Sequence, residues 1–271
     1  LPDSLGQKWY ERGYYGTVNH DAKAVYQRYL GWYDGNPANL YPLPEPEAAK
    51  KYVELMGGAN VILPKAQAAF DAGEYRWVAE LLKQVVFADP SNQKARNLQA
   101  DAFEQLGYQM ENPTWRNEFL MGAYELRNGV PHALKSGSSS LDMIEAMSPE
   151  LLLDYMGIRL NGPAAADKHS TIIWQLPNSS TSYALELRNG VLIYTKDKPI
   201  KNPDAVLTAD KDSFAALLMG SNELQTQLDN HRLKITGNEA KVKELYALLV
   251  HFDPMFNIIT PQGNLTPPAG Y

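Results

Sequence analysis

Two patterns of hydrophobic and polar residues divide the chain. Between residues 47 and 128, apolar positions recur with a helical period. The helical segments that this period predicts are 48–56, 61–72, 74–88, 91–107 and 114–127. The breaks between them contain Gly57-Gly58, Gly73, Asp89-Pro90 and Asn112-Pro113, which supply helix stops and polar caps. The pattern in this segment therefore predicts an all-α domain.

Residues 141–271 follow a different pattern. A helix is expected after Ser148-Pro149, where Ser provides a cap and Pro suits the first helical position. The expected strands are 170–176, 182–187, 191–195, 205–208 and 233–236, and further helices are expected at 210–219 and 238–251. Asn189-Gly190 joins the second and third strands and predicts a type I′ hairpin turn. We expect an α+β layer with helices on one face of a sheet.

Two segments lie outside these patterns. Residues 1–45 are rich in Tyr and Trp, and they contain one short amphipathic helix at 21–33 that ends before Gly35-Asn36-Pro37. Residues 129–140 lack either period and are expected to form a linker. The fold class is thus α+β overall. The chain divides into an aromatic-rich segment at 1–45, a helical domain at 46–128, the linker at 129–140 and an α+β domain at 141–271. Residues 73–108 of the helical domain resemble a single tetratricopeptide-like hairpin.

Composition excludes several classes of function. The chain is 44% hydrophobic over 271 residues, which is enough for a sizeable core in each of two domains. A net charge of −6 without a basic cluster argues against a nucleic-acid partner. Without cysteine there are neither disulfides nor thiolate metal sites, which fits cytoplasm or periplasm. No apolar run approaches the roughly 20 residues of a membrane span.

The longest motifs resemble a known enzyme family. Residues 12–20 and 23–40 closely resemble the end of the catalytic domain in alkylsulfatases of the metallo-β-lactamase superfamily. Residues 73–79, 86–90, 115–117 and 122–129 look like the dimerisation domain of that family. Residues 141–260 are similar to its sterol-carrier-protein-2-like domain. The resemblance therefore covers nearly the whole chain.

The resemblance implies an enzyme that hydrolyses primary or secondary alkyl sulfate esters to alcohol and sulfate. It implies a periplasmic or secreted homodimer, in which two zinc ions held by His, Asp and Glu activate water. The zinc-binding motif His-x-His-x-Asp-His is absent, and the five histidines are far apart in sequence. The chain also starts without an initiator Met or a signal peptide. We expect it to belong to a longer polypeptide whose upstream part holds the zinc, and to be inactive and free of metal alone.

Three residues are candidates for the sulfate pocket. The resemblance places Tyr41 where many relatives carry His, in a position to reach the sulfate, and a phenol there is a neutral donor near pH 7. Such a change would suit attack of water at carbon with inversion; alternatively, Tyr41 packs in a loop. Arg28 and Asn36 suit an anion, since guanidinium binds sulfate in bidentate fashion. The alternative for these two is a buried pair that fixes the loop. His20, in the same motif, is expected to be a hydrogen-bonded packing residue.

The last domain offers candidates for contact with an alkyl chain. Trp174, Tyr183 and Phe256 could line an apolar pocket, although ordinary core packing explains such positions equally well. In this interpretation the helical domain makes the dimer and the last domain recruits the substrate. The alternative function is a non-catalytic module that binds lipid or mediates association. A tetratricopeptide-type peptide binder ranks last, because a single hairpin provides no concave surface.

Overall fold

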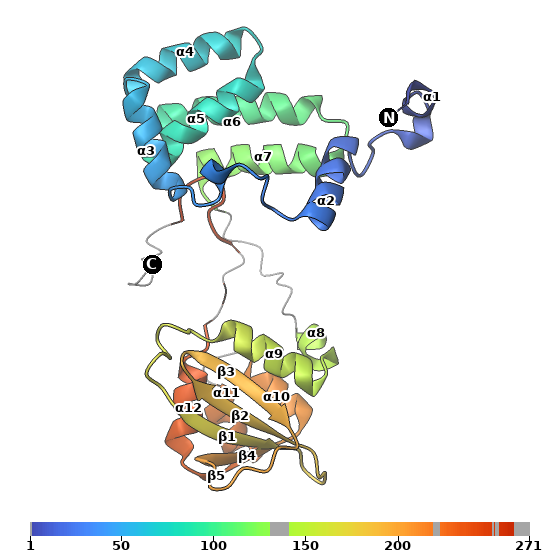
Figure 1. The fold of residues 1–271 in the computed structure, drawn as a ribbon, viewed down its shortest axis with the longest axis vertical. Coiled ribbons are helices and arrows are strands. Elements are labelled where there is room, and N and C mark those ends of the chain that lie inside the picture. Colours follow the sequence, from blue (N-terminus) through green and yellow to red (C-terminus); the bar gives the residue numbers. More distant parts are fainter. Residues whose placement is uncertain (1, 131–140, 219–222, 251, 253–254, 263–271) are drawn as a thin grey trace. The chain divides into compact units, whose positions relative to one another are not determined.

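The computed structural model describes residues 2–130, 141–218, 223–250, 252 and 255–262, and the chain divides into two units (Figure 1). The first unit contains residues 2–130 and 255–262, and the second contains 141–250 with its gap at 219–222. The expected linker lies largely outside the described residues. In the part of the chain that the structure covers, no helix has both the length and the apolarity needed to cross a bilayer.

Polar caps fix where the helices of the first unit begin. Thr17 accepts a hydrogen bond from the amide of His20, and Asn92 and Asn112 cap two later helices in the same way. The elements are α1 (Asp3–Gly6), η1 (Trp9–Glu11), α2 (Val18–Leu30), η2 (Pro37–Asn39), α3 (Glu45–Leu55), α4 (Ala59–Asp71), α5 (Tyr75–Ala88), α6 (Gln93–Gln109) and α7 (Pro113–Asn128). All the expected helices are present, and the one expected at 21–33 starts three residues earlier, at its Thr cap.

Helix α5 is the centre of the first unit. It packs against α3, α4 and α6, and α6 packs in turn against α7. Val78, Leu82 and Val85 recur at helical spacing on its buried face, and they join Ala95 of α6 and Leu126 of α7 in one core. The predicted period thus corresponds to real burial.

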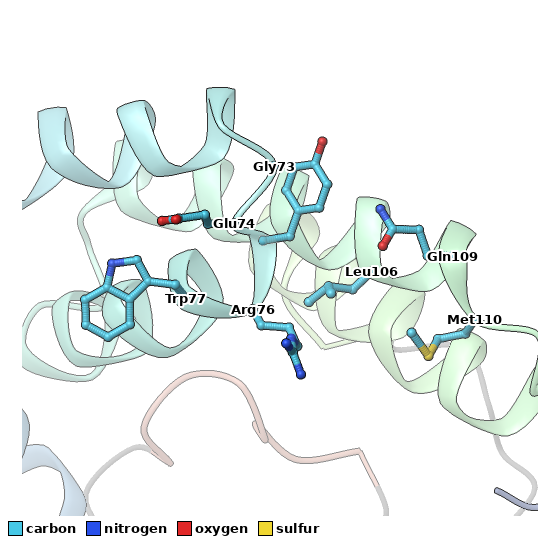
Figure 2. A pocket seen from close by; sticks show the side chains of 8 residues that line it. Gly73, Glu74, Arg76, Trp77, Leu106, Gln109 and Met110 are labelled. Carbon is cyan, nitrogen blue, oxygen red and sulfur yellow. The ribbon is translucent and has the colours of Figure 1, made fainter.

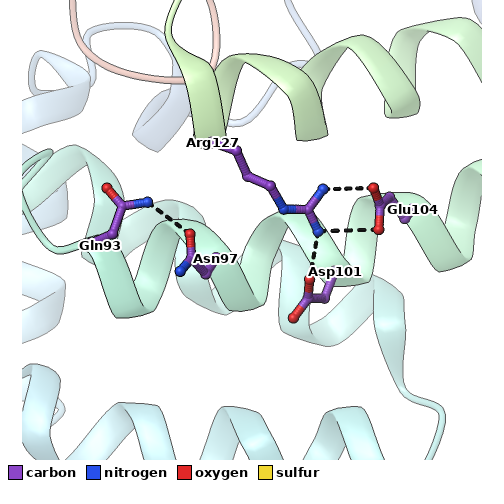
Figure 3. Close-up of polar contacts among 5 residues, drawn as sticks. All are labelled: Gln93, Asn97, Asp101, Glu104 and Arg127. Carbon is purple, nitrogen blue, oxygen red and sulfur yellow. Dashed lines mark hydrogen bonds and ion pairs between the residues drawn. The ribbon is translucent and has the colours of Figure 1, made fainter.

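An ion-pair fork, made by Arg127 of α7 with two acidic residues of α6, connects the exposed sides of these helices. The Arg127 guanidinium donates to both carboxylate oxygens of Glu104, at 2.6 and 3.1 Å, and to Asp101 Oδ1 at 2.6 Å (Figure 3). The hydrogen bond to Glu104 is the main reason why the pKa of Arg127 is raised. Because these side chains are partly exposed, the fork orients the two helices more than it stabilises them.

Residues 255–262, here called the strap, return to the helical unit. The backbone amides of Ile258 and Ile259 both donate to Oε1 of the buried Glu125, at 2.9 and 3.0 Å. Ile259 packs against the helical core. The sequence pattern grouped this segment with residues 141–271, but the structure groups it with the helices. Its apolar residues and the buried carboxylate of α7 account for the difference.

The second unit is a sheet covered by helices. Its elements are α8 (Leu141–Ala146), α9 (Pro149–Arg159), β1 (Ser170–Gln175), β2 (Ser182–Arg188), β3 (Val191–Lys196), β4 (Ala205–Ala209), α10 (Lys211–Leu217), α11 (Glu223–Asp229), β5 (Leu233–Gly237) and α12 (Glu239–Ala247). The strand order is β3-β2-β1-β4-β5, with β1 and β4 parallel and the other neighbours antiparallel. Every second residue of β1 and β4 is buried. The expected α+β class is confirmed.

The predicted hairpin turn is present. Asn189 and Gly190 have φ of 53° and 70°, as a type I′ turn requires. A Cβ at Gly190 would lie 2.8 Å from the carbonyl oxygen of Gly162, so this position needs glycine for space as well as for its dihedral angle. The short helices α8 and α11 were not predicted.

Replacing Glu125 should release the strap. In Glu125→Ala, the amides of Ile258 and Ile259 lose a charged acceptor worth about 1.5–3 kcal/mol, so their hydrogen exchange should accelerate about tenfold to a hundredfold. Amide exchange followed by NMR measures this directly. Glu118→Ala, at an exposed position of the same helix, is the matched control. Unchanged exchange in Glu125→Ala would show that the carboxylate does not hold the strap.

Candidate functional site

Residues 2–45 form a surface that the rest of the first unit leaves uncovered. All of them are described, and none is buried. Eight aromatic side chains of this segment are about half exposed or more: Trp9, Tyr10, Tyr14, Tyr15, Tyr26, Tyr29, Trp32 and Tyr41. Large aromatic rings concentrated at a surface are typical of an interface.

The start of α7 anchors this segment. Asn112, which is buried, donates its side-chain amide to the backbone carbonyl of Tyr15, while its Oδ1 caps α7 through the amide of Trp115. Thr114 donates to the same carbonyl at 3.3 Å, and Trp115 Nε1 donates to His20 Nδ1 at 3.0 Å. The segment therefore has a fixed attachment, here called the α7 anchor, made by residues 112–115.

Ion pairs secure the segment on either side of α2. Arg12 pairs with Glu111 at 2.8 Å, immediately before the α7 anchor, and Glu45 at the start of α3 pairs with Lys83 of α5. The interpretation of His20 as a hydrogen-bonded packing residue agrees with its bond to Trp115. Asn112 and Thr114 were not predicted, since their partner is a backbone group almost a hundred residues away. Between the two attachments, neither α2 nor η2 contains a buried residue.

The three candidates for the sulfate pocket lie in this part of the segment. Arg28 is in the last turn of α2, Asn36 caps η2, and Tyr41 follows η2 with 91% of its surface exposed. Within residues 2–45, no hydrogen bond or ion pair joins the three to one another. Arg28 and Asn36 are both exposed among the described residues, so the buried pair of the alternative is not formed within them. All three side chains are exposed, although Oδ1 of Asn36 is already engaged by the amide of Ala38.

The loop that presents these residues is organised by its own hydrogen bonds. Asn36 Oδ1 accepts from the amide of Ala38, and the amide of Asn36 donates to Asp34 Oδ1 at 2.9 Å. Asn39 Nδ2 donates to the other oxygen of Asp34 at 2.6 Å. The amide of Asn36, followed by Asn39, lowers the pKa of Asp34. A ligand would therefore meet a loop whose conformation is already set.

The alkyl-chain candidates are divided between the two units. Trp174 and Tyr183 are fully buried in the core of the second unit, where Trp174 stacks on Phe214 with ring centroids 3.8 Å apart. Trp174 Nε1 donates to the carbonyl of Ala209 at 2.9 Å. Phe256 is about half exposed and belongs to the strap of the first unit. Core packing, the alternative for Trp174 and Tyr183, describes their positions.

The hydroxyl group of a buried tyrosine in the second unit is hydrogen-bonded to a carboxylate. Tyr183 OH donates to Glu150 Oε1 at 2.8 Å, and Lys196 Nζ reaches the same oxygen at 3.2 Å. The bond from Tyr183, followed by the backbone and Lys196, lowers the pKa of Glu150 to about 2. Burial, followed by Glu150, raises the pKa of Tyr183 above its ordinary value. The site joins α9 to β2 and β3 as a structural contact.

A cavity of about 720 Å³ opens at the start of α5 (Figure 2). Glu74 and Arg76 line it with opposite charges, together with Trp77 and the end of α6. This lining favours neither an anion nor a cation, and we assign no ligand to the cavity.

No group of three or more His, Asp or Glu side chains gathers among the residues that the structure describes. His20 is engaged by Trp115, and His169 and His231 belong to the second unit. These residues do not fit a zinc centre, and no step of a reaction is assigned to a metal within them.

Comparison with known proteins decides the family. A family model described as alkyl sulfatase dimerisation matches residues 1–129, and one described as alkyl sulfatase C-terminal matches residues 137–261. The chain consists of the dimerisation and C-terminal domains of the alkyl sulfatase family. The expected family resemblance is thereby confirmed.

Curated relatives share this region of sequence. A linear primary-alkylsulfatase of Pseudomonas sp. is 45% identical over 96% of this chain and 39% of its own length. The alkyl/aryl-sulfatase BDS1 of Saccharomyces cerevisiae is 44% identical over 98% of this chain and 41% of its own length. The solved structure of the stereoselective inverting sec-alkylsulfatase Pisa1 from Pseudomonas sp. superposes with a TM-score of 0.89 at 44% identity, covering 97% of this chain and 41% of that one. The chain thus spans about two fifths of the length of these relatives.

The contact between Glu150 and Tyr183 gives the C-terminal domain a defined acid sensitivity. Because the pKa of Glu150 falls from 4.5 to about 2 on folding, its charge stabilises the fold above the unfolded pKa, and this contribution is lost as pH falls towards 2. The difference in melting temperature between the natural protein and Glu150→Gln should therefore shrink between pH 4.5 and 2. Glu239→Gln, which removes a surface pair with Lys243, is the control. Circular dichroism melts measure both; a difference that does not change with pH would contradict the assignment.

Proposed function

We propose that this chain is the part of a zinc-dependent alkylsulfatase that makes the dimer and supplies one wall of the sulfate pocket. The observation that carries the proposal is the exposed segment 12–45, which is firmly attached at the α7 anchor and presents Arg28, Asn36 and Tyr41. The match to the alkyl sulfatase dimerisation family supports the homodimer. A periplasmic or secreted location stays a prediction from the resemblance.

In the reaction, an alkyl sulfate and water give an alcohol and hydrogen sulfate. The zinc ions, held outside the described residues, would supply water activation. The residues of this chain act on the anion: the guanidinium of Arg28 offers two parallel donors to sulfate oxygens, and the phenol of Tyr41 offers one neutral donor. The hydrogen-bonded loop 34–39 keeps their backbone in place before the substrate arrives.

We further propose attack of water at carbon for secondary substrates. Water oxygen then forms the new C–O bond and loses a proton, while the original C–O bond breaks and its electron pair leaves with the sulfate. The sulfate gains charge as it departs, and donors such as Tyr41 stabilise it. Relatives of the chain include both a primary and an (R)-specific secondary alkylsulfatase, so the choice of substrate class belongs to the proposal.

Isotope labelling tests the course of attack. In water enriched in ¹⁸O, the longer polypeptide that carries this chain should place the label in the alcohol produced from a secondary alkyl sulfate. Mass spectrometry of the alcohol and of the sulfate measures this. Label found only in the sulfate would mean attack at sulfur and would remove the proposed role of Tyr41 in supporting departure of the whole sulfate.

Metal content separates the enzyme from the alternative function, a non-catalytic lipid-binding and association module. The 271-residue chain alone should contain no stoichiometric zinc, because its described residues offer no ligand set. The longer polypeptide should contain about two zinc ions per chain, bound by His-x-His-x-Asp-His, if the proposal holds. Elemental analysis of both proteins decides this. A natural polypeptide without such a motif or metal would favour the alternative.

A further inference from the structure

A groove of about 730 Å³ is lined by α7, by Tyr15 beside the α7 anchor and by the strap. It is called the α7 groove here. Its apolar lining is Tyr15, Pro113, Met121, Gly122, Ile258 and Ile259. The volume falls within the range of about 300–1,000 Å³ that is typical of small-molecule sites.

The walls of the α7 groove are fixed by hydrogen bonds. On one side, the carbonyl of Tyr15 is held by Asn112 and Thr114; on the other, the amides of Ile258 and Ile259 are held by Glu125. Gly122 allows the strap and the core to approach α7 closely, because a Cβ there would lie 3.2 Å from the ring of Phe103 and 3.5 Å from Ile259 Cδ1. Three segments that are distant in sequence therefore form one preorganised site.

The charged side chains that line the α7 groove determine which polar group an apolar ligand can carry there. Glu118 and Glu125 line the α7 groove, and none of the described residues that line it is basic. A sulfate group placed here would face like charge and find no cationic partner, which disfavours an alkyl sulfate. A hydroxyl group, in contrast, is a donor that a carboxylate accepts.

We propose that the α7 groove binds a neutral aliphatic alcohol, with the chain along Met121 and the strap. Long-chain alcohols are the products of the reaction proposed above, and the biological meaning of the site rests on that proposed function. The binding itself does not, since it depends only on residues of the helical unit.

Isothermal titration calorimetry on the full 271-residue chain tests the proposal. The probes are 1-decanol and decyl sulfate, both kept below the concentrations at which they aggregate. Met121, 51% exposed, is changed to Lys, which places an ammonium group against the chain and adds a partner for sulfate. Met143→Lys is the matched control, because Met143 is 49% exposed and lies on α8 of the other unit.

The natural chain should bind 1-decanol at least about tenfold more tightly than decyl sulfate. Met121→Lys should weaken decanol binding by about tenfold and narrow or reverse this preference, while Met143→Lys should change neither. Absent decanol binding, equal binding of decyl sulfate, or an unaffected Met121→Lys would overturn the proposal. So would sedimentation showing that Met121→Lys turns a dimer into a monomer, since a second copy would then occupy the groove. None of these results would alter the labelling and metal measurements that test the proposed function.

Discussion

The buried side chain of Asn112 connects more of the helical unit than any other single polar group described above. Its Oδ1 accepts a hydrogen bond from the amide of Trp115 and so caps the start of α7. Its Nδ2 donates to the carbonyl of Tyr15. A buried amide needs both kinds of partner, so the two bonds depend on each other. One side chain therefore fixes the start of a core helix, the attachment of the exposed segment 12–45 and one wall of the α7 groove.

Local signals in the sequence predicted the parts of the fold that depend on neighbouring residues. Asn112-Pro113 marked the start of α7, and Asn189-Gly190 marked the hairpin between β2 and β3, because cap and turn chemistry act over a few positions. The bond from Asn112 to Tyr15 and the clasp of Glu125 on the strap escaped prediction. Both join polar side chains to backbone groups that are distant in the chain, 97 residues away for Asn112 and 133 for Glu125, and a single sequence carries no period or spacing that reveals such pairs.

The candidate sites show the same limit. Trp174 and Tyr183 were candidates for a pocket because of their apolar character, but this character does not separate a pocket lining from a stacked core, and the structure places both in the core. Phe256 was grouped with them by its position in the chain, whereas the strap takes it to the other unit. For Arg28, Asn36 and Tyr41, the motif predicted a shared segment. The structure adds that this segment is anchored, exposed and internally hydrogen-bonded, which suits a preformed wall that another surface completes.

The central proposal is that segment 12–45 contributes to sulfate binding in a longer enzyme, and Arg28 offers its most direct test. In that enzyme, Arg28→Met should lower kcat/KM for an alkyl sulfate by about tenfold to a hundredfold, because a charged, bidentate contact to the anion is lost. Arg28→Lys should recover only part of it. Zinc content should stay unchanged, and Arg76→Met, at an exposed position of α5, should have no effect. Unchanged kinetics in Arg28→Met, or a loss of activity that follows a loss of zinc, would contradict the proposal.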